Sequence, residues 1–166
     1  MIRAIALGLC LLLGACAAHT PLPSDIPDLE ASLPLSLHIQ REQAGMRQDW
    51  LLIIQADGSG LRWSLFDPLG VPLARQRLHA GAWQDDGLLP PNAEARPLFA
   101  ALLFALTPAK QLARGYPAGS WQLDADGQRR LNPNWRIGYR SPLDFTLNSA
   151  PDTTYQVSAL PPAENL

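Results

Sequence analysis

The stretch NAEARPLFAALLFAL, residues 92–106, decides the fold, because every residue from 98 to 106 is apolar. A surface helix normally keeps a polar face, so a helix with this sequence has to be covered nearly all round. Its Ala, Leu and Phe content suits a helix of about three to four turns. We expect Pro97 to start this helix, since proline is tolerated in the first turn, and Pro108 to help end it.

Strands with one buried and one wet face would supply that cover. Alternation is clearest in Leu61-Arg62-Trp63-Ser64-Leu65, where the apolar residues share one face. Asp-Gly pairs at 57–58, 86–87 and 126–127 separate such runs and favour tight hairpins between sequential antiparallel strands. The predicted fold class is α+β: a strongly curved antiparallel sheet, or half-barrel, wrapped around one apolar helix. The predicted strands are residues 35–40, 50–55, 61–65, 72–79, 120–124, 135–140, 143–148 and 154–159.

The first residues, MIRAIALGLCLLLGAC, have the layout of a secretory signal, with Arg3 ahead of an apolar run that closes on small residues. The run is about 12 residues long, whereas a membrane-spanning helix needs about 20. It ends in Leu13-Gly14-Ala15-Cys16, which resembles the lipobox of bacterial lipoproteins. The resemblance implies that residues 1–15 are a signal peptide and that Cys16 becomes the acylated first residue of the mature protein.

A lipid on Cys16 would attach the protein to a membrane through its acyl chains. Ala17 stands where an inner-membrane lipoprotein of enterobacteria has Asp, so the resemblance favours the outer membrane, on its periplasmic side. Cys10 leaves with the signal peptide and Cys16 is consumed by acylation, so the mature chain has no disulfide and no thiolate metal site. The alternative is an ordinary secreted protein with a coincidental cysteine.

The rest of the chain reads as one domain with flexible ends. Residues 16–34 carry the lipid and form a flexible tether, because they are rich in Pro and small polar residues without a period. Residues 35–160 form the folded domain, and 161–166 form a flexible tail. Loss of Arg3 leaves 12 of 13 basic residues against 15 acidic ones, a balance that gives no reason to expect nucleic acid. We expect a monomer.

No motif points to catalysis, a cofactor or a metal. The chain has no G-x-S-x-G elbow, no H-E-x-x-H pair and no phosphate-binding glycine loop. His38 and His79 stand alone in strand-like segments, where a structural role is the commoner one. The pair Arg129-Arg130 could touch anionic headgroups or simply solvate a strand. We therefore expect neither an enzyme nor a bound cofactor or metal ion.

The turn Phe66-Asp67-Pro68-Leu69-Gly70-Val71-Pro72-Leu73 carries an apolar residue, Leu69, near its tip. An isolated exposed leucine also occurs as ordinary surface. A strand, this turn, a second strand, a Pro-rich step and an apolar helix follow in an order that resembles the LolB family of outer-membrane lipoprotein receptors. In that family an Asn-Pro-Leu-Gly turn presents a protruding leucine that helps deliver lipoproteins into the membrane. The resemblance implies that Leu69 contacts membrane or cargo.

Three further segments extend this resemblance. Residues 112–117 and 134–139 are similar to later parts of LolB. The step Leu88-Leu89-Pro90-Pro91 before the apolar helix more closely resembles an uncharacterised LolB-like lipoprotein family that is often encoded with aryl polyene biosynthesis genes. The resemblance implies a LolA/LolB-like half-barrel that binds or transfers the acyl chains of a lipid, a lipoprotein or a polyene lipid.

Acyl chains need a dry concavity, because each buried methylene contributes about 0.8 kcal/mol. Apolar residues of the strands and the helix supply candidates to line it: Trp50, Leu52, Ile54, Leu61, Trp63, Leu65, Leu98, Leu102, Trp121, Trp135 and Phe145. The same side chains could instead fill a core. The alternative function is then a non-catalytic structural or interaction lipoprotein that serves an envelope complex, or an accessory binding subunit of a polyene-lipid enzyme.

Overall fold

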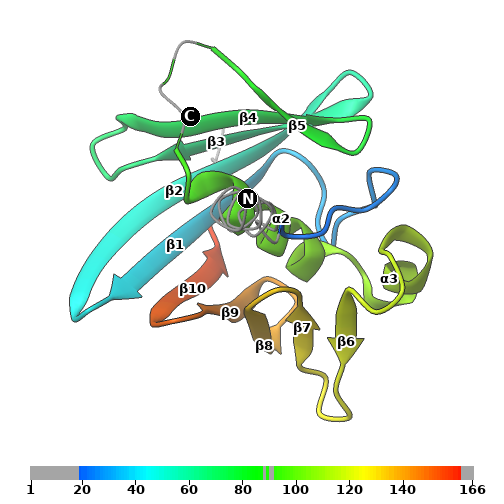
Figure 1. Ribbon diagram of the computed structural model, residues 1–166. Helices are drawn as coiled ribbons and strands as arrows, with labels where there is room; N and C mark the ends of the chain where they lie inside the picture. Colours follow the sequence, from blue (N-terminus) through cyan, green and yellow to red (C-terminus); the bar gives the residue numbers. More distant parts are fainter. Residues whose placement is uncertain (1–18, 88, 90–91, 162–166) are drawn as a thin grey trace, which may run out of the picture.

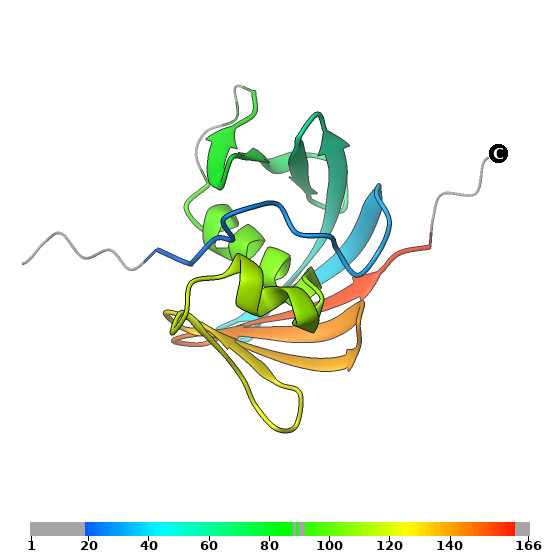
Figure 2. The same cartoon turned by 90° about the vertical axis from the view of Figure 1, so that its right-hand side faces the viewer.

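The fold is an open, strongly curved antiparallel sheet with a helix in its hollow (Figures 1 and 2). The computed structural model describes residues 19–87, 89 and 92–161. The sheet has ten strands in the order β5-β4-β3-β2-β1-β10-β9-β8-β7-β6, so β5 and β6 are its two edges. The predicted α+β class, a curved antiparallel sheet around an apolar helix, is confirmed. The predicted signal peptide, Cys16 and residues 162–166 lie outside the described residues.

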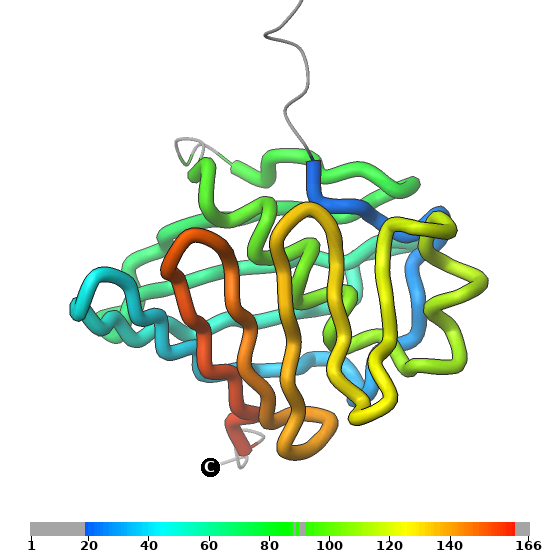
Figure 3. Tube along the Cα trace, turned by 60° about the horizontal axis from the view of Figure 1, so that its bottom comes forward, coloured from blue at the N-terminus to red at the C-terminus, as the bar shows by residue number. Residues whose placement is uncertain are grey.

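Two meanders make up the sheet. The first contains β1 (Leu35–Gln43), β2 (Met46–Asp57), β3 (Gly60–Phe66), β4 (Pro72–His79) and β5 (Ala82–Asp85). The second contains β6 (Trp121–Leu123), β7 (Arg129–Leu131), β8 (Trp135–Ser141), β9 (Asp144–Ser149) and β10 (Thr153–Ala159). Each strand pairs with its neighbour in sequence, and the meanders join where β1 pairs with β10. Figure 3 shows the hairpins of the second meander lying side by side.

The connection from edge to edge contains α2 (Ala95–Leu106) and α3 (Ala109–Gly115). Helix α2 begins at Ala95, so the prediction that Pro97 starts it is wrong by two residues. The reason is the side chain of Asn92, whose Oδ1 accepts hydrogen bonds from the backbone N–H groups of Glu94 and Ala95 and so orders the turn from which the helix begins. Pro97 still lies in the first turn, where its missing N–H costs nothing.

The predicted covering of α2 is confirmed, since all residues from 98 to 106 are buried. The sheet covers one side, and the segment before β1 lies across the other (Figure 2). Glu30 N donates to Leu106 O over 2.8 Å, and Ser24 N donates to Gly115 O over 2.9 Å. The prediction of a flexible tether is therefore wrong for residues 20–34. The sheet leaves the helix open on this side, and the apolar side chains that pack there are Leu22, Ile26, Leu29, Ala31 and Leu33.

All eight predicted strands are present, with ends shifted by a few residues. Strands β5 and β7 and helix α3 were not predicted, because β5 and β7 have only four and three residues, too few for alternation to show. Two Asp-Gly pairs form the predicted hairpin turns, between β2 and β3 and between β6 and β7. The pair Asp86-Gly87 instead leads out of β5 toward α2, because no strand follows it.

Candidate functional site

The residues predicted to line a cavity form the core instead. Trp50 and Trp121 are half-buried, and the other nine are buried. Trp63 on β3 shows how the space is filled, because its ring lies 5.4 Å from that of Phe99 on α2 and 5.6 Å from that of Trp83 on β5. Within the described part of the chain, α2 therefore occupies the hollow of the sheet. This arrangement corresponds to the filled-core alternative.

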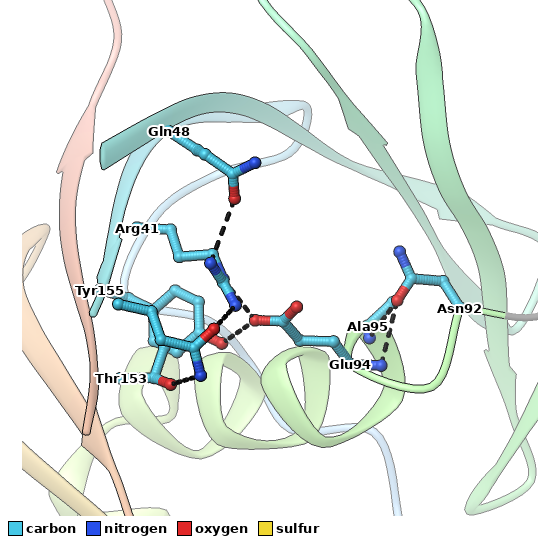
Figure 4. Close-up of polar contacts among 8 residues, drawn as sticks. Arg41, Gln48, Asn92, Glu94, Ala95, Thr153 and Tyr155 are labelled. Atoms are coloured by element: carbon cyan, nitrogen blue, oxygen red, sulfur yellow. Dashed lines mark hydrogen bonds and ion pairs between the residues drawn. The ribbon is translucent and has the colours of Figure 1, made fainter. Parts of the chain in front are cut away.

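A partly buried polar cluster holds the start of α2 to the sheet (Figure 4). The guanidinium of Arg41, on β1, donates from Nε to Oε1 of Glu94 over 2.6 Å. The hydroxyl of Tyr155, on β10, donates to the same carboxylate oxygen. Arg41 also donates to the side-chain oxygens of Gln43 and Gln48. We call these five residues the start clamp.

Burial and pairing with Glu94 both change the pKa values of Arg41 and Tyr155 in the start clamp. Burial lowers the pKa of Arg41, but the hydrogen bond and charge of Glu94 outweigh it and raise that pKa above its usual value. Burial, followed by Glu94, raises the pKa of Tyr155, so its phenol stays protonated and donates. The guanidinium also lies 5.7 Å from the ring centre of Trp50. The start clamp therefore places a hydrogen-bonded ion pair at the first turn of α2.

A second arginine holds the other end of the same helix. Arg129 on β7 is only 7% exposed, and its Nη1 donates to the carbonyl oxygens of Phe104, Ala105 and Thr107 over 3.1, 3.3 and 2.7 Å. These carbonyls lie at the C-terminal end of α2, where a helix runs short of backbone donors and its dipole favours a cation. Phe104 O also accepts the backbone N–H of Thr107. The guanidinium also stacks 4.9 Å from the ring centre of Tyr139, which donates from its hydroxyl to Ala105 O. We call Arg129 and Tyr139 the end clamp.

Sequence reasoning missed both clamps, although each left a signal. Arg41 has the same parity as Leu37 and Ile39 in β1, and all three are buried on the inner face. Arg129 has the same parity as buried Leu131 in β7, whereas Arg130 is exposed and pairs with Asp124. The prediction that Arg129 and Arg130 either touch headgroups or solvate a strand is therefore wrong for Arg129. A charged residue at an inward position indicates a buried partner.

The turn between β3 and β4 presents Leu69 to solvent on a rigid support. Leu69 is 89% exposed. One carboxylate oxygen of Asp67 accepts hydrogen bonds from the backbone N–H groups of Leu69 and Val71, over 2.9 and 2.8 Å. Two backbone bonds, from Asp67 N to Val71 O and from Gly70 N to Asp67 O, close the turn. Gly70 has φ of +81°, a conformation that favours glycine. The loop therefore holds its leucine outward.

Other apolar side chains gather at the same end of the sheet. Val71 follows Leu69 in the turn and is 52% exposed, and Met46, at the turn between β1 and β2, is 66% exposed. Figure 1 shows the β1–β2 and β3–β4 turns at one end of the molecule. We call Leu69 and Val71 the apolar tip. A side chain that is apolar, exposed and rigidly held is arranged for contact with an apolar surface.

A cleft lies at the open side of the half-barrel, between the first turn of α2 and loops of both meanders. Its volume is about 490 Å³. We call it the edge cleft, and its apolar walls are Leu22, Ala82, Trp83, Pro97, Ala100 and Trp135. Trp135 is thus the one predicted lining residue that borders this cleft. His19, Thr20, Arg96 and Asn134 add polar groups around it.

The two histidines in strands, His38 and His79, each lie beside a polar partner. His38 donates from Nε2 to Oδ1 of Asp49 over 2.8 Å on the outer face of the sheet, and His79 lies near Ser59. Among the described residues, no three His, Cys, Asp or Glu side chains come together as a metal site. No helix in the described ranges is long and apolar enough to span a membrane.

Comparison with known families gives a match over most of the folded domain. The family described as protein of unknown function (DUF3261) matches residues 35–141. The chain belongs to the DUF3261 family. No curated protein matches the chain. The DUF3261 match spans β1 to β8 and both helices, so it includes the apolar tip, Arg41, Glu94 and the end clamp.

Proposed function

We propose that the protein is an acylated lipoprotein of the outer membrane, facing the periplasm, that binds or transfers acyl chains through a LolB-like half-barrel. The lipobox at residues 13–16 supports the anchor, and the curved sheet around α2 supports a LolA/LolB-like fold. The exposure of Leu69 on its rigid turn is the observation that carries the proposal. Leu69 acts in this account as the residue that contacts the membrane or the cargo.

The free energy gained by burying one leucine side chain fits this role. Burying a leucine side chain contributes about 1.5–3 kcal/mol, which is too little to hold a protein at a membrane by itself. It is enough to orient a domain that Cys16 already keeps there. The Asp67 hydrogen bonds lower the cost further, since the turn is ordered before contact and loses little conformational freedom on contact.

The filled hollow sets a condition on how acyl chains bind. Helix α2 fills the concave side of the sheet. An acyl chain that enters there has to take the place of part of α2. The start and end clamps fix the two ends of this helix and so determine how readily it gives way. The filled hollow equally favours the second candidate, a non-catalytic interaction lipoprotein, in which α2 stays in place and the outer surfaces serve an envelope complex.

Replacing Leu69 by glutamate tests the proposal. We expect the free energy of unfolding to change by less than about 0.5 kcal/mol, because an exposed side chain makes few contacts. We expect transfer of lipid to liposomes to be lost, because a carboxylate cannot enter the apolar membrane region without a large desolvation cost. Thermal unfolding and a liposome transfer assay on the same purified variant measure both effects.

Leu123→Glu is the matched control, since Leu123 is 49% exposed on edge strand β6 of the other meander. It should keep both stability and transfer. A large stability loss in the Leu69 variant would make Leu69 part of the packing. Unimpaired transfer would mean that Leu69 is an ordinary surface residue without a contact role, and the proposal would then lose its main support.

A further inference from the structure

The edge cleft has the size and lining of a ligand site. Pockets that bind small molecules typically measure about 300–1,000 Å³ and are mainly apolar, and the edge cleft has about 490 Å³. Pro97 and Ala100 of α2 face Ala82 and Trp83 of β5 across it. The charge of Arg96 at its border is already paired, with Asp85 over 2.8 Å and with Gln76 over 3.0 Å. The cleft therefore suits an uncharged apolar chain.

The N-terminal segment reaches its described end in this cleft. His19, Thr20 and Leu22 border the cleft, and Nε1 of Trp135 donates to Oγ1 of Thr20 over 3.4 Å. Cys16 stands three positions before His19 in the sequence. At about 3.3 Å per residue, the three residues that separate Cys16 from His19 in the sequence span at most about 10 Å, so a lipid on Cys16 is within reach of the cleft border. An acyl chain on Cys16 therefore starts next to an apolar space large enough to receive it.

We propose that the edge cleft receives an acyl chain of the protein's own lipid anchor. The inference rests on the proposed function, because it requires Cys16 to be acylated. Lipoprotein anchors carry two or three chains, so one chain can occupy the cleft while the others stay in the bilayer. The docked chain holds the domain close to the membrane and keeps the cleft from other lipids.

Photo-crosslinking in intact cells tests this inference on the full-length protein. Cells are grown with a fatty acid that bears a diazirine in its chain, irradiated, and the protein is purified and digested. We expect mass spectrometry to find the acylated Cys16 peptide joined to a peptide of the same chain that contains Trp83, Pro97 or Trp135. Thermal unfolding of the two variants described next, Pro97→Glu and Ala109→Glu, is measured in parallel.

Pro97→Glu places a carboxylate in the cleft without disturbing the fold. Pro97 is exposed in the first turn of α2, where the helix dipole favours an acidic residue. We expect the crosslink yield to fall about tenfold, which corresponds to a loss of about 1.4 kcal/mol in docking. The matched control is Ala109→Glu, at the exposed first residue of α3 and not among the residues that line the cleft. It should keep the wild-type yield.

The other outcomes distinguish a failure of the acyl-chain docking from a failure of the proposed function. A labelled Cys16 peptide that is crosslinked to phospholipid alone would overturn the docking. It would leave the lipoprotein assignment unaffected. Phospholipid adducts on the cleft peptides, without a joined Cys16 peptide, would make the cleft a site for free lipid and would equally overturn it. Absence of label from the Cys16 peptide would overturn the docking together with the proposed function.

Discussion

Replacing Cys16 by serine is expected to release the protein completely from the membrane and to abolish its labelling by palmitate. Two or three acyl chains anchor a protein in an effectively stable way, whereas a single chain binds only marginally. Leu69 by itself cannot substitute for them, since about 3 kcal/mol from its side chain gives an affinity weaker than 1 mM, which needs about 4.1 kcal/mol. Metabolic palmitate labelling and separation of membrane from soluble fractions measure the effect.

Cys10→Ser is the matched control, because Cys10 lies inside the predicted signal peptide. It should leave both label and membrane attachment unchanged. A Cys16→Ser protein that keeps its label, or that remains in the membrane fraction, would contradict the lipoprotein assignment.

Replacing Arg129 by methionine is expected to lower the free energy of unfolding by about 1–3 kcal/mol. The change removes the donor that the carbonyl oxygens of Phe104, Ala105 and Thr107 share. Phe104 O keeps the backbone N–H of Thr107 and Ala105 O keeps the hydroxyl of Tyr139, so Thr107 O loses its donor in a buried place. A buried polar group without its partner costs about 1–3 kcal/mol, and methionine fills the space of the arginine stem without replacing the donor. Urea unfolding of the purified domain measures the loss.

Arg130→Met, one position away, is the control for this prediction. Arg130 is exposed and pairs with Asp124 over 2.9 Å, and an exposed ion pair contributes about 0–1 kcal/mol. Equal losses from the two variants would mean that the guanidinium of Arg129 does not hold the end of α2. A loss confined to Arg129→Met would support the end clamp.

The parts of the fold that follow from short-range patterns were predictable. Nine consecutive apolar residues from 98 to 106 required a covered helix, and alternation in residues 61–65 required a sheet with one buried face. The turn around Leu69 could be placed because Asp-Pro and Gly fix the backbone there. These features depend on neighbours in the sequence, so the sequence alone specifies them.

The parts that depend on distant contacts were not predictable in the same way. Arg129 binds carbonyls that are 22 to 25 positions away in the chain, and Arg41 binds Glu94, 53 positions away. The segment 19–34 has no helical or strand period and becomes ordered only because it covers a side of α2 that the sheet leaves open. The filled hollow likewise depends on how the side chains of α2 meet those of the sheet.

Native mass spectrometry of the domain without residues 1–16 tests the central claim, that this protein binds acyl chains, most directly. Without Cys16 the edge cleft is free of the protein's own lipid, so the account predicts a domain that purifies with a bound lipid or fatty acid. We expect the added mass to disappear when Pro97→Glu is introduced and to persist in Ala109→Glu. A domain that purifies empty, and takes up no lipid from vesicles, would contradict acyl-chain binding and favour an interaction lipoprotein with a permanently filled core.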